Sequence, residues 1–183
     1  MKPIRDFSHG DTRAPYLVTY QVYDPEFPAV FLKIKKLIQD VAGPIVVEHF
    51  GSSSIPGLGG RGALDIAIPA PESEHSYLRQ LLYGIGFQDS PFPHYLPLLV
   101  GCLSHIQRNY AILLYLVLPE SKVYTDWLKF RCHMLNNLED ASAYDDVKRQ
   151  AIARGDTQGE PYQEAKLPFL TAIEDKLKGE IPR

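Results

Sequence analysis

The chain has 183 residues, of which 45% are hydrophobic, and 19 basic and 22 acidic residues give it a formal net charge of −3. This length predicts a single domain over residues 1–183, and the apolar content is too high for an intrinsically disordered chain. The slight acidic surplus argues against general nucleic-acid binding, which needs a basic surface.

The compartment is predicted from what the sequence lacks. Cys102 and Cys132 are too few for the disulfide framework of a small secreted protein. The first 15 residues have no apolar segment of the kind found in signal peptides. Because no apolar run approaches the roughly 20 residues of a membrane helix, we expect a cytoplasmic protein that does not bind membranes.

The first third of the chain predicts one strand and one helix. Residues 1–15 are polar, and we expect them to be loose. Residues 17–22 fit a short edge strand. Asp24 is a suitable N-cap and Pro25 suits the first position of a helix whose apolar residues recur at helical spacing. Gly43 is expected to end that helix.

The middle of the chain predicts a sheet. Residues 45–50 and 63–68 read as strands on either side of a glycine-rich loop, and residues 73–83 read as a helix. Two further apolar runs, 95–102 and 110–118, predict two more strands. The second of them is apolar enough to be the central strand.

Three helices are predicted after Pro119, over residues 122–138, 142–153 and 160–178. The order of elements predicts an α/β (α+β) fold with a mixed sheet flanked by helices and a helical C-terminal third.

The loop between the two strands at 45–50 and 63–68 is the most informative segment. It contains five glycines and three serines. Glycine permits close approach of the backbone to a ligand, and turn amides can point together at an anion. We therefore predict a phosphate cradle in which Gly51, Ser52 and Ser53 contact the ligand. An ordinary connecting loop is the alternative.

Asp65 lies inside the strand that follows this loop. Side chains alternate between the faces of a strand, so Leu64, Ile66 and Ile68 share one face and Asp65 shares the other with two alanines. A carboxylate between alanines leaves room for a ligand or a metal ion. The alternative is a pairing with an arginine.

Three basic residues fall in or beside the apolar stripes of the C-terminal helices: Arg131, Lys148 and Lys166, the last in the same stripe as Tyr162. A core-facing cation without a partner is costly, so these residues predict a pocket for an anion. The alternatives are side chains that extend to solvent, or a salt bridge to a residue such as Asp65 or Glu48.

Residues 49–66 resemble a motif of the GrpB (UPF0157) family, a branch of the nucleotidyltransferase superfamily. Residues 23–28 and 127–131 are similar to two further segments of that family. Its last helices are matched by two tyrosine–lysine pairs, Tyr144 with Lys148 and Tyr162 with Lys166. The resemblance covers about residues 17–178.

The resemblance implies the α/β nucleotidyltransferase fold, with a Gly-Ser turn on nucleotide phosphates and strand carboxylates on a divalent metal. It makes Asp65 the metal ligand and catalytic residue, with Mg²⁺ as the implied cofactor. Arg61, Arg131 and Lys166 would neutralise phosphate charge. The chain departs from the pattern at Ala67, which stands in the place of the second metal carboxylate.

We therefore hypothesise that the protein binds a nucleotide or another anionic small molecule without metal-dependent catalysis. The first alternative is an active Mg²⁺-dependent nucleotidyltransferase that acts on a small molecule or a protein acceptor. The second is a structural or interaction protein whose glycine-rich segment is only a turn.

Overall fold

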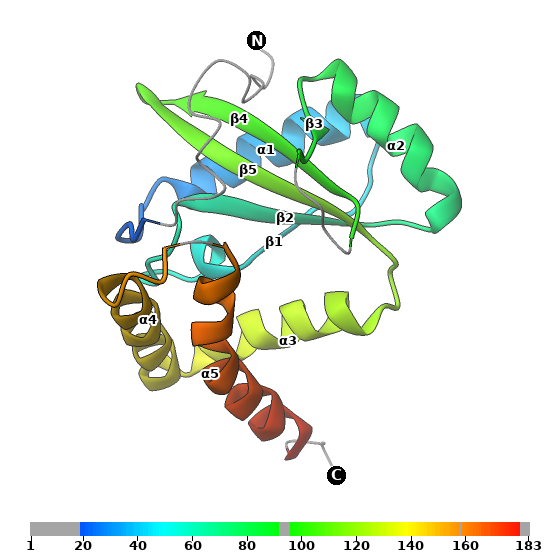
Figure 1. Cartoon of the computed structure of the whole chain (residues 1–183). Helices are drawn as coiled ribbons and strands as arrows, with labels where there is room; N and C mark the ends of the chain where they lie inside the picture. Colours follow the sequence, from blue (N-terminus) through cyan, green and yellow to red (C-terminus); the bar gives the residue numbers. More distant parts are fainter. Residues whose placement is uncertain (1–18, 92–95, 158, 180–183) are drawn as a thin grey trace.

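The computed structural model describes residues 19–91, 96–157 and 159–179. Within these residues the chain forms helices and a five-stranded sheet (Figure 1). In chain order the elements are α1 (Phe27–Ala42), β1 (Glu48–Phe50), the short 3-10 helix η2 (Ser52–Ser54), β2 (Ala63–Pro69), α2 (Glu72–Gly84), β3 (Gln88–Asp89), β4 (Leu98–His105), β5 (Arg108–Val117), α3 (Lys122–Asn136), α4 (Leu138–Ala153) and α5 (Gly159–Gly179).

The sheet is mixed and has the strand order β1-β2-β5-β4-β3. β2 and β5 are parallel, and the other neighbouring strands are antiparallel. β5 lies in the centre of the sheet, which confirms the expectation from its apolar composition. In the pairing of β1 with β2, Phe50 lies opposite Asp65 and Glu48 lies opposite Ala67.

One face of the sheet forms the main hydrophobic core with α1 and α2. Leu64, Ile66 and Ile68 of β2 are fully buried in this core, as the alternation along the strand predicts. Ile34 and Ile38 of α1 pack in the same cluster. The apolar stripe of α1 therefore covers the apolar face of the central strands.

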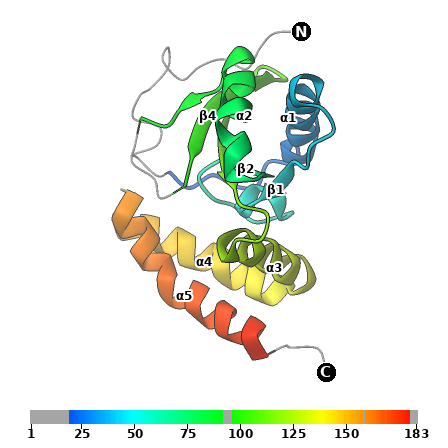
Figure 2. The same ribbon diagram turned by 90° about the vertical axis from the view of Figure 1, so that its right-hand side faces the viewer.

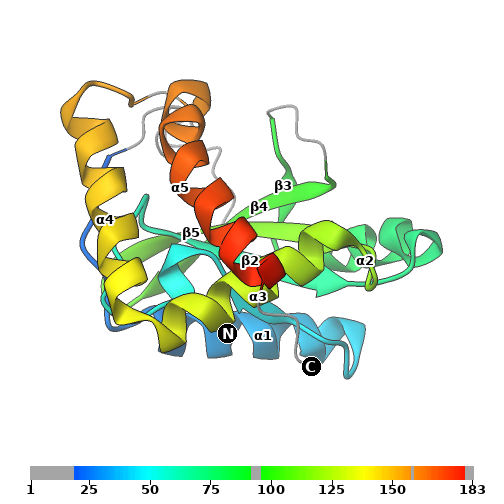
Figure 3. The same ribbon diagram turned by 90° about the horizontal axis from the view of Figure 1, so that it is seen from below.

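The C-terminal helices form a separate layer beyond the other face of the sheet (Figure 2). Seen from below, α5 begins beside α4, and its C-terminal end crosses α3 (Figure 3). These helices share a second core with two residues of the glycine-rich loop, Ile55 and Leu58. The loop is thus anchored between the sheet and the helical layer.

The start of α1 differs from the prediction. The helix begins at Phe27 with Glu26 as the N-cap, and the proline in its first turn is Pro28. Asp24 is not the N-cap. Its carboxylate accepts a hydrogen bond from the backbone N–H of Glu26 at 3.0 Å and pairs with Arg108 of β5, so a tertiary contact determines its role.

The predicted strands also shift. β1 is shorter than residues 45–50 because it begins at Glu48, and the two-residue strand β3 was not predicted. In the segment expected to form an edge strand, Gln21 makes an isolated bridge to Gly60. The expected loose residues 1–15 lie outside the described part of the chain. No helix of the described part is long and apolar enough to cross a bilayer.

Candidate functional site

A large cleft of about 1330 Å³ lies between the sheet and the C-terminal helices. Its walls come from the glycine-rich loop, from β2 and β5, and from the facing sides of α3, α4 and α5. Most of the predicted ligand residues line this one opening: Gly51, Ser52, Ser53, Arg61, Asp65, Lys148, Tyr162 and Lys166. The topology thus brings together side chains more than 100 positions apart in the sequence.

Asp65 is packed against the first residue of the loop. Gly51 has a φ of +69°, and a Cβ at this position would lie 2.3 Å from Oδ2 of Asp65. Glycine is needed here for its backbone conformation and for the space that the carboxylate occupies. Burial raises the pKa of Asp65, while the nearby Arg61 and Lys166 act in the opposite direction.

The nearest cation to Asp65 is the guanidinium of Arg61, with Nη2 3.9 Å from Oδ1. This distance is too long for a direct hydrogen bond. Both side chains are only partly exposed, and they lie close together without a hydrogen bond between them. The Arg61 guanidinium remains available to hydrogen-bond with a ligand in the cleft.

Lys148 holds the loop from the side of α4. Its side chain is only 1% exposed. The ammonium group donates to the carbonyl oxygen of Gly59 and to Oγ of Ser52 at 3.2 Å. Burial lowers the pKa of Lys148 to about 8, although Asp145 at 3.7 Å favours the charged form.

Asp145 of α4 also holds the glycine-rich loop in place, and no sequence pattern predicts this role. Its carboxylate accepts hydrogen bonds from the backbone N–H of Gly59 at 2.9 Å and from the Tyr20 hydroxyl at 2.7 Å. Arg149 pairs with it at 2.8 Å. Asp145 lies three residues before Lys148, but no local motif marks a helical carboxylate that fixes a loop 86 residues away.

Lys166 enters the cleft from α5. Its Nζ lies 4.6 Å from the centroid of the Tyr162 ring, a favourable cation–π distance. Burial lowers the pKa of Lys166 to about 7, the charge of Arg61 adds to this effect, and Asp65 opposes it. Burial also raises the pKa of the Tyr162 hydroxyl to about 12.

Arg131 does not join the other predicted ligand residues. Its guanidinium donates to Oε2 of Glu48 at 3.0 Å and to the backbone carbonyl of His49. It lines a smaller hollow of about 390 Å³ instead of the large cleft. The alternative of a salt bridge to Glu48 therefore describes Arg131, and this residue ties α3 to the edge strand β1.

Ser53 lines the cleft but its hydroxyl has a partner. Oγ of Ser53 and Nε2 of His49 share a hydrogen bond of 2.9 Å, and the His49 ring stacks on Phe31. Burial lowers the pKa of His49 to about 4, and the charge of Arg131 adds to this effect. A neutral His49 thus holds Ser53 in place within the turn. The hydroxyl of Ser52, in contrast, is in hydrogen-bond contact with a cation that lines the cleft, Lys148.

An aromatic wall lies beside Asp65 on the same face of the sheet. Trp127 of α3 stacks on Phe50 with the ring centroids 4.2 Å apart, and it meets Tyr115 edge-on at 5.3 Å. All three residues line the cleft. The apolar spacing along α3 does not identify Trp127 as part of this wall, because a helical stripe does not distinguish a packed core from the lining of a cleft.

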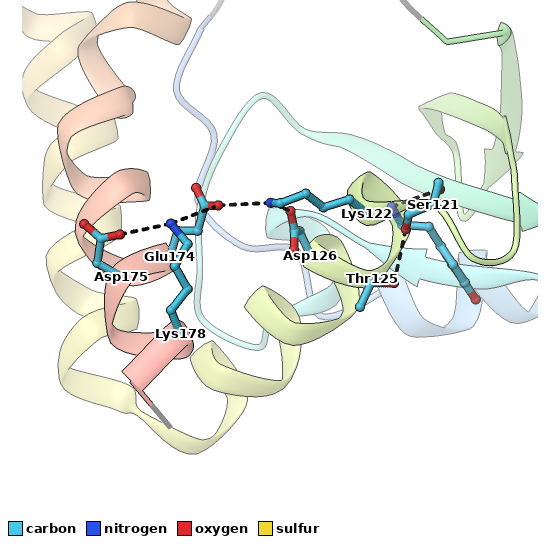
Figure 4. Close-up of polar contacts among 8 residues, drawn as sticks. Ser121, Lys122, Thr125, Asp126, Glu174, Asp175 and Lys178 are labelled. Carbon is cyan, nitrogen blue, oxygen red and sulfur yellow. Dashed lines mark hydrogen bonds and ion pairs between the residues drawn. The ribbon is translucent and has the colours of Figure 1, made fainter. Parts of the chain in front are cut away.

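The mouth of the cleft is lined by exposed ion pairs between α3 and α5, and Figure 4 shows these pairs. Lys122 of α3 pairs with Asp126 and with Oε1 of Glu174 at 3.0 Å, and Lys178 lies 3.5 Å from the same glutamate oxygen. The Lys122 side chain is exposed, so each pair contributes little to stability. These residues place charge at the mouth of the cleft.

The groups around Asp65 do not fit a magnesium centre. Magnesium sites in proteins are built from oxygen ligands, usually one or two carboxylates together with water and phosphate oxygens. Across the described residues no cluster of three or more His, Cys, Asp or Glu side chains comes together. Ala67, two residues after Asp65 on the same side of β2, carries no carboxylate. Glu48 pairs with Arg131, and among the described residues the charged group nearest to Asp65 is the Arg61 guanidinium.

Two solved structures share this arrangement of strands and helices. The crystal structure of the conserved protein GrpB from Enterococcus faecalis matches with a TM-score of 0.71 and 19% identity, over 87% of this chain and 96% of that one. The GLD-2/RNP-8 complex matches with a TM-score of 0.53 and 12% identity, over 71% of this chain and 55% of that one. The fold is the nucleotidyltransferase-like mixed sheet with a helical C-terminal region.

Sequence comparison gives the same relationship. A UPF0157 protein of Streptomyces coelicolor is 28% identical over 161 residues, which cover 84% of this chain and 81% of the relative. The family model described as GrpB protein matches residues 18–176. The chain therefore belongs to the GrpB family.

Proposed function

We propose that the cleft binds a nucleotide or another anionic small molecule, and that this chain does so without a catalytic metal ion. The observation that carries the proposal is the charge of the cleft. Six basic and three acidic side chains line it, although the whole chain has a net charge of −3. A concave site that concentrates positive charge attracts anions.

The innermost cations indicate where in the cleft an anionic group would bind. Arg61 in the loop and Lys166 on α5 approach Asp65 from two parts of the fold, and Lys148 donates a hydrogen bond to Ser52. Guanidinium and ammonium groups make the stronger, charge-assisted hydrogen bonds to phosphate and carboxylate oxygens. We place the anionic group of the ligand between Arg61, Ser52 and Lys166.

The aromatic wall favours a nucleotide within the class of anions. Trp127 and Tyr115 line the same cleft as the cations and present aromatic rings to its interior. Rings of this kind stack with planar bases, at about 1–3 kcal/mol per base in nucleic-acid complexes. At about 1330 Å³, the cleft exceeds the ~300–1,000 Å³ of ordinary small-molecule pockets, so it has room for a nucleotide.

Calorimetric titration with ATP, GTP, CTP and UTP tests the proposal. The wild-type chain and Asp65→Ala are each titrated in EDTA and then in Mg²⁺. We expect binding in EDTA that Asp65→Ala retains or strengthens, because this change removes a negative charge from the anion site and frees Arg61.

Two other outcomes contradict the proposal. Binding that requires Mg²⁺ and disappears in Asp65→Ala supports the metal-dependent nucleotidyltransferase instead. If none of the four nucleotides binds, and inorganic phosphate and pyrophosphate do not bind either, the cleft is not an anion site. Because the chain has a single tryptophan, quenching of Trp127 fluorescence gives an independent readout of occupancy near the aromatic wall.

A further inference from the structure

Lys166 differs from the other cations at the inner end of the cleft because its amine has no hydrogen-bond or ion-pair partner in the part of the chain that the structure describes. Lys148 donates to two loop oxygens, and Arg61 faces the carboxylate of Asp65. Among the residues that the structure describes, no carboxylate oxygen lies within 4 Å of Nζ of Lys166, and no protein acceptor takes a hydrogen bond from it. The amine lies above the Tyr162 ring and lines the cleft.

The charged and aromatic groups that act on this amine come from four parts of the fold. Arg61 belongs to the loop, Asp65 to β2, Lys148 to α4 and Tyr162 to α5. Two of these groups are cations, only one is a carboxylate, and the fourth is an aromatic ring. Burial is the largest influence, and together with Arg61 and Lys148 it lowers the pKa of Lys166 to about 7 despite Asp65. A substantial fraction of this amine is therefore neutral at physiological pH, and a desolvated lysine beside another cation is the usual setting of a nucleophilic lysine.

We infer that Lys166 is a nucleophilic amine that forms an imine with an aldehyde or ketone group on an anionic molecule bound in the cleft. The inference rests on the proposed function, because Arg61 and the loop hold the anionic group while the carbonyl reaches Lys166. The permanent charge of Arg61 suits the anion, and the unpaired amine suits the carbonyl carbon.

The chemistry balances without a further reactant. The lone pair of the neutral Nζ attacks the carbonyl carbon, and one proton of the attacking amine moves to the carbonyl oxygen to give a neutral carbinolamine. Loss of the second amine proton and of the hydroxyl group as water leaves a carbon–nitrogen double bond. One carbonyl compound and one amine give one imine and one water, and no atom is oxidised or reduced.

Pyridoxal 5′-phosphate is a suitable probe because it carries both an aldehyde and a phosphate. The intact chain is treated with one equivalent at pH 7.4, borohydride reduces any imine to a stable amine, and peptide mass mapping locates the label. An ordinary lysine has only about one neutral amine in a thousand at this pH. We expect label at Lys166 at least roughly tenfold above that at exposed lysines such as Lys36, whose side chain is 70% exposed.

The controls separate this inference from the proposed function. Lys166→Arg keeps a cation in the cleft and should lose the selective label, and calorimetry with inorganic phosphate measures the anion site independently. Labelling spread over exposed lysines, with phosphate still bound, overturns the inference and leaves the proposed function standing. Pyridoxal without its phosphate should label Lys166 more weakly. Equal labelling would support the nucleophile but count against the anion site.

Discussion

The two faces of strand β2 have opposite surroundings although their residues alternate along one short segment. Leu64, Ile66 and Ile68 are fully buried in the apolar core against α1 and α2. Asp65, one position away from two of them, faces the charged cleft. The same seven residues thus stabilise the sheet on one side and carry the candidate site on the other.

The two faces of β2 differ in whether they tolerate polar groups. The core face allows none, because an unpaired polar group there would lose its hydrogen bonds to water. The cleft face holds a carboxylate whose pKa is raised by burial and an amine whose pKa is lowered by burial. Both are disfavoured in their charged forms, and such groups are common at functional sites.

The largest effect should come from the core face. Ile66→Ala is expected to lower the free energy of unfolding by about 2–5 kcal/mol, because it leaves a cavity in a fully buried cluster. Asp65→Ala, at the adjacent position, should cost no stability at pH 7. The folded-state pKa of Asp65 is raised, so its charged form destabilises the folded protein above that pKa. The stability gained by removing the carboxylate should therefore decrease as the pH falls toward 4. Urea unfolding at both pH values measures both variants, and equal losses would contradict the contrast between the faces.

The next effect concerns the contact between the loop and Asp65. Gly51→Ala should destabilise the protein by about 1–3 kcal/mol, because alanine is strained at a φ of +69° and its Cβ would meet the carboxylate. Gly57→Ala is a matched control, since φ is +83° there and a Cβ would meet no atom within 4 Å. The difference between the two variants, measured by thermal unfolding, reports the clash alone. It should shrink when Asp65→Ala is added to both, because that change removes the carboxylate and leaves only Cβ of residue 65, 3.0 Å from the added Cβ. A difference that does not shrink would place the clash elsewhere.

A smaller and pH-dependent effect is expected at Lys166. The folded-state pKa of about 7 lies below the ordinary value of 10.5, so the unfolded chain binds more protons between these two pH values. Lys166→Met should therefore raise the unfolding free energy by roughly 1 kcal/mol at pH 6, a figure discounted for solvent that reaches the amine. The gain should shrink as the pH rises from 7 toward 10. Lys36→Met serves as the exposed control, and a gain at Lys166 that does not change with pH would contradict the burial of an unpaired charge.

The smallest effect is expected at the mouth of the cleft. Glu174→Gln removes the carboxylate that Lys122 and Lys178 share across α3 and α5 (Figure 4). Because these pairs are exposed, the loss of stability should be the smallest of the set and should vanish in 1 M salt. Denaturant midpoints at low and high salt test this, and a loss that is as large as that of Gly51→Ala and independent of salt would mean that the pairs hold the helical layer in place.

Local patterns were sufficient for most of the helices and strands and for the two faces of β2. The alternation in 63–68 placed Asp65 opposite the core, and the apolar run at 110–118 identified the central strand. The start of α1 was misplaced because the partners of Asp24 lie on β5, far along the chain. A capping pattern does not contain such a contact.

The candidate site could be predicted only in part for the same reason. The glycine-rich loop, Asp65 and Lys166 carry local signals, and the structure brings them to one cleft. Arg131 has the same signal as Lys166, a cation in an apolar helical stripe, yet it pairs with Glu48 on the edge strand. Asp145 and Trp127 lie at the site without a pattern that distinguishes them from an ordinary helical surface or core.

Arg61 and Arg131 give the most direct test of the proposed anion site, because only Arg61 lines the cleft. Pyrophosphate is titrated calorimetrically in EDTA into the wild-type chain, Arg61→Met and Arg131→Met, with folding verified for each. We expect binding that Arg61→Met weakens by about 10- to 100-fold and that Arg131→Met leaves nearly unchanged. Loss of binding in Arg131→Met with normal binding in Arg61→Met would move the anion site out of the cleft and contradict the account.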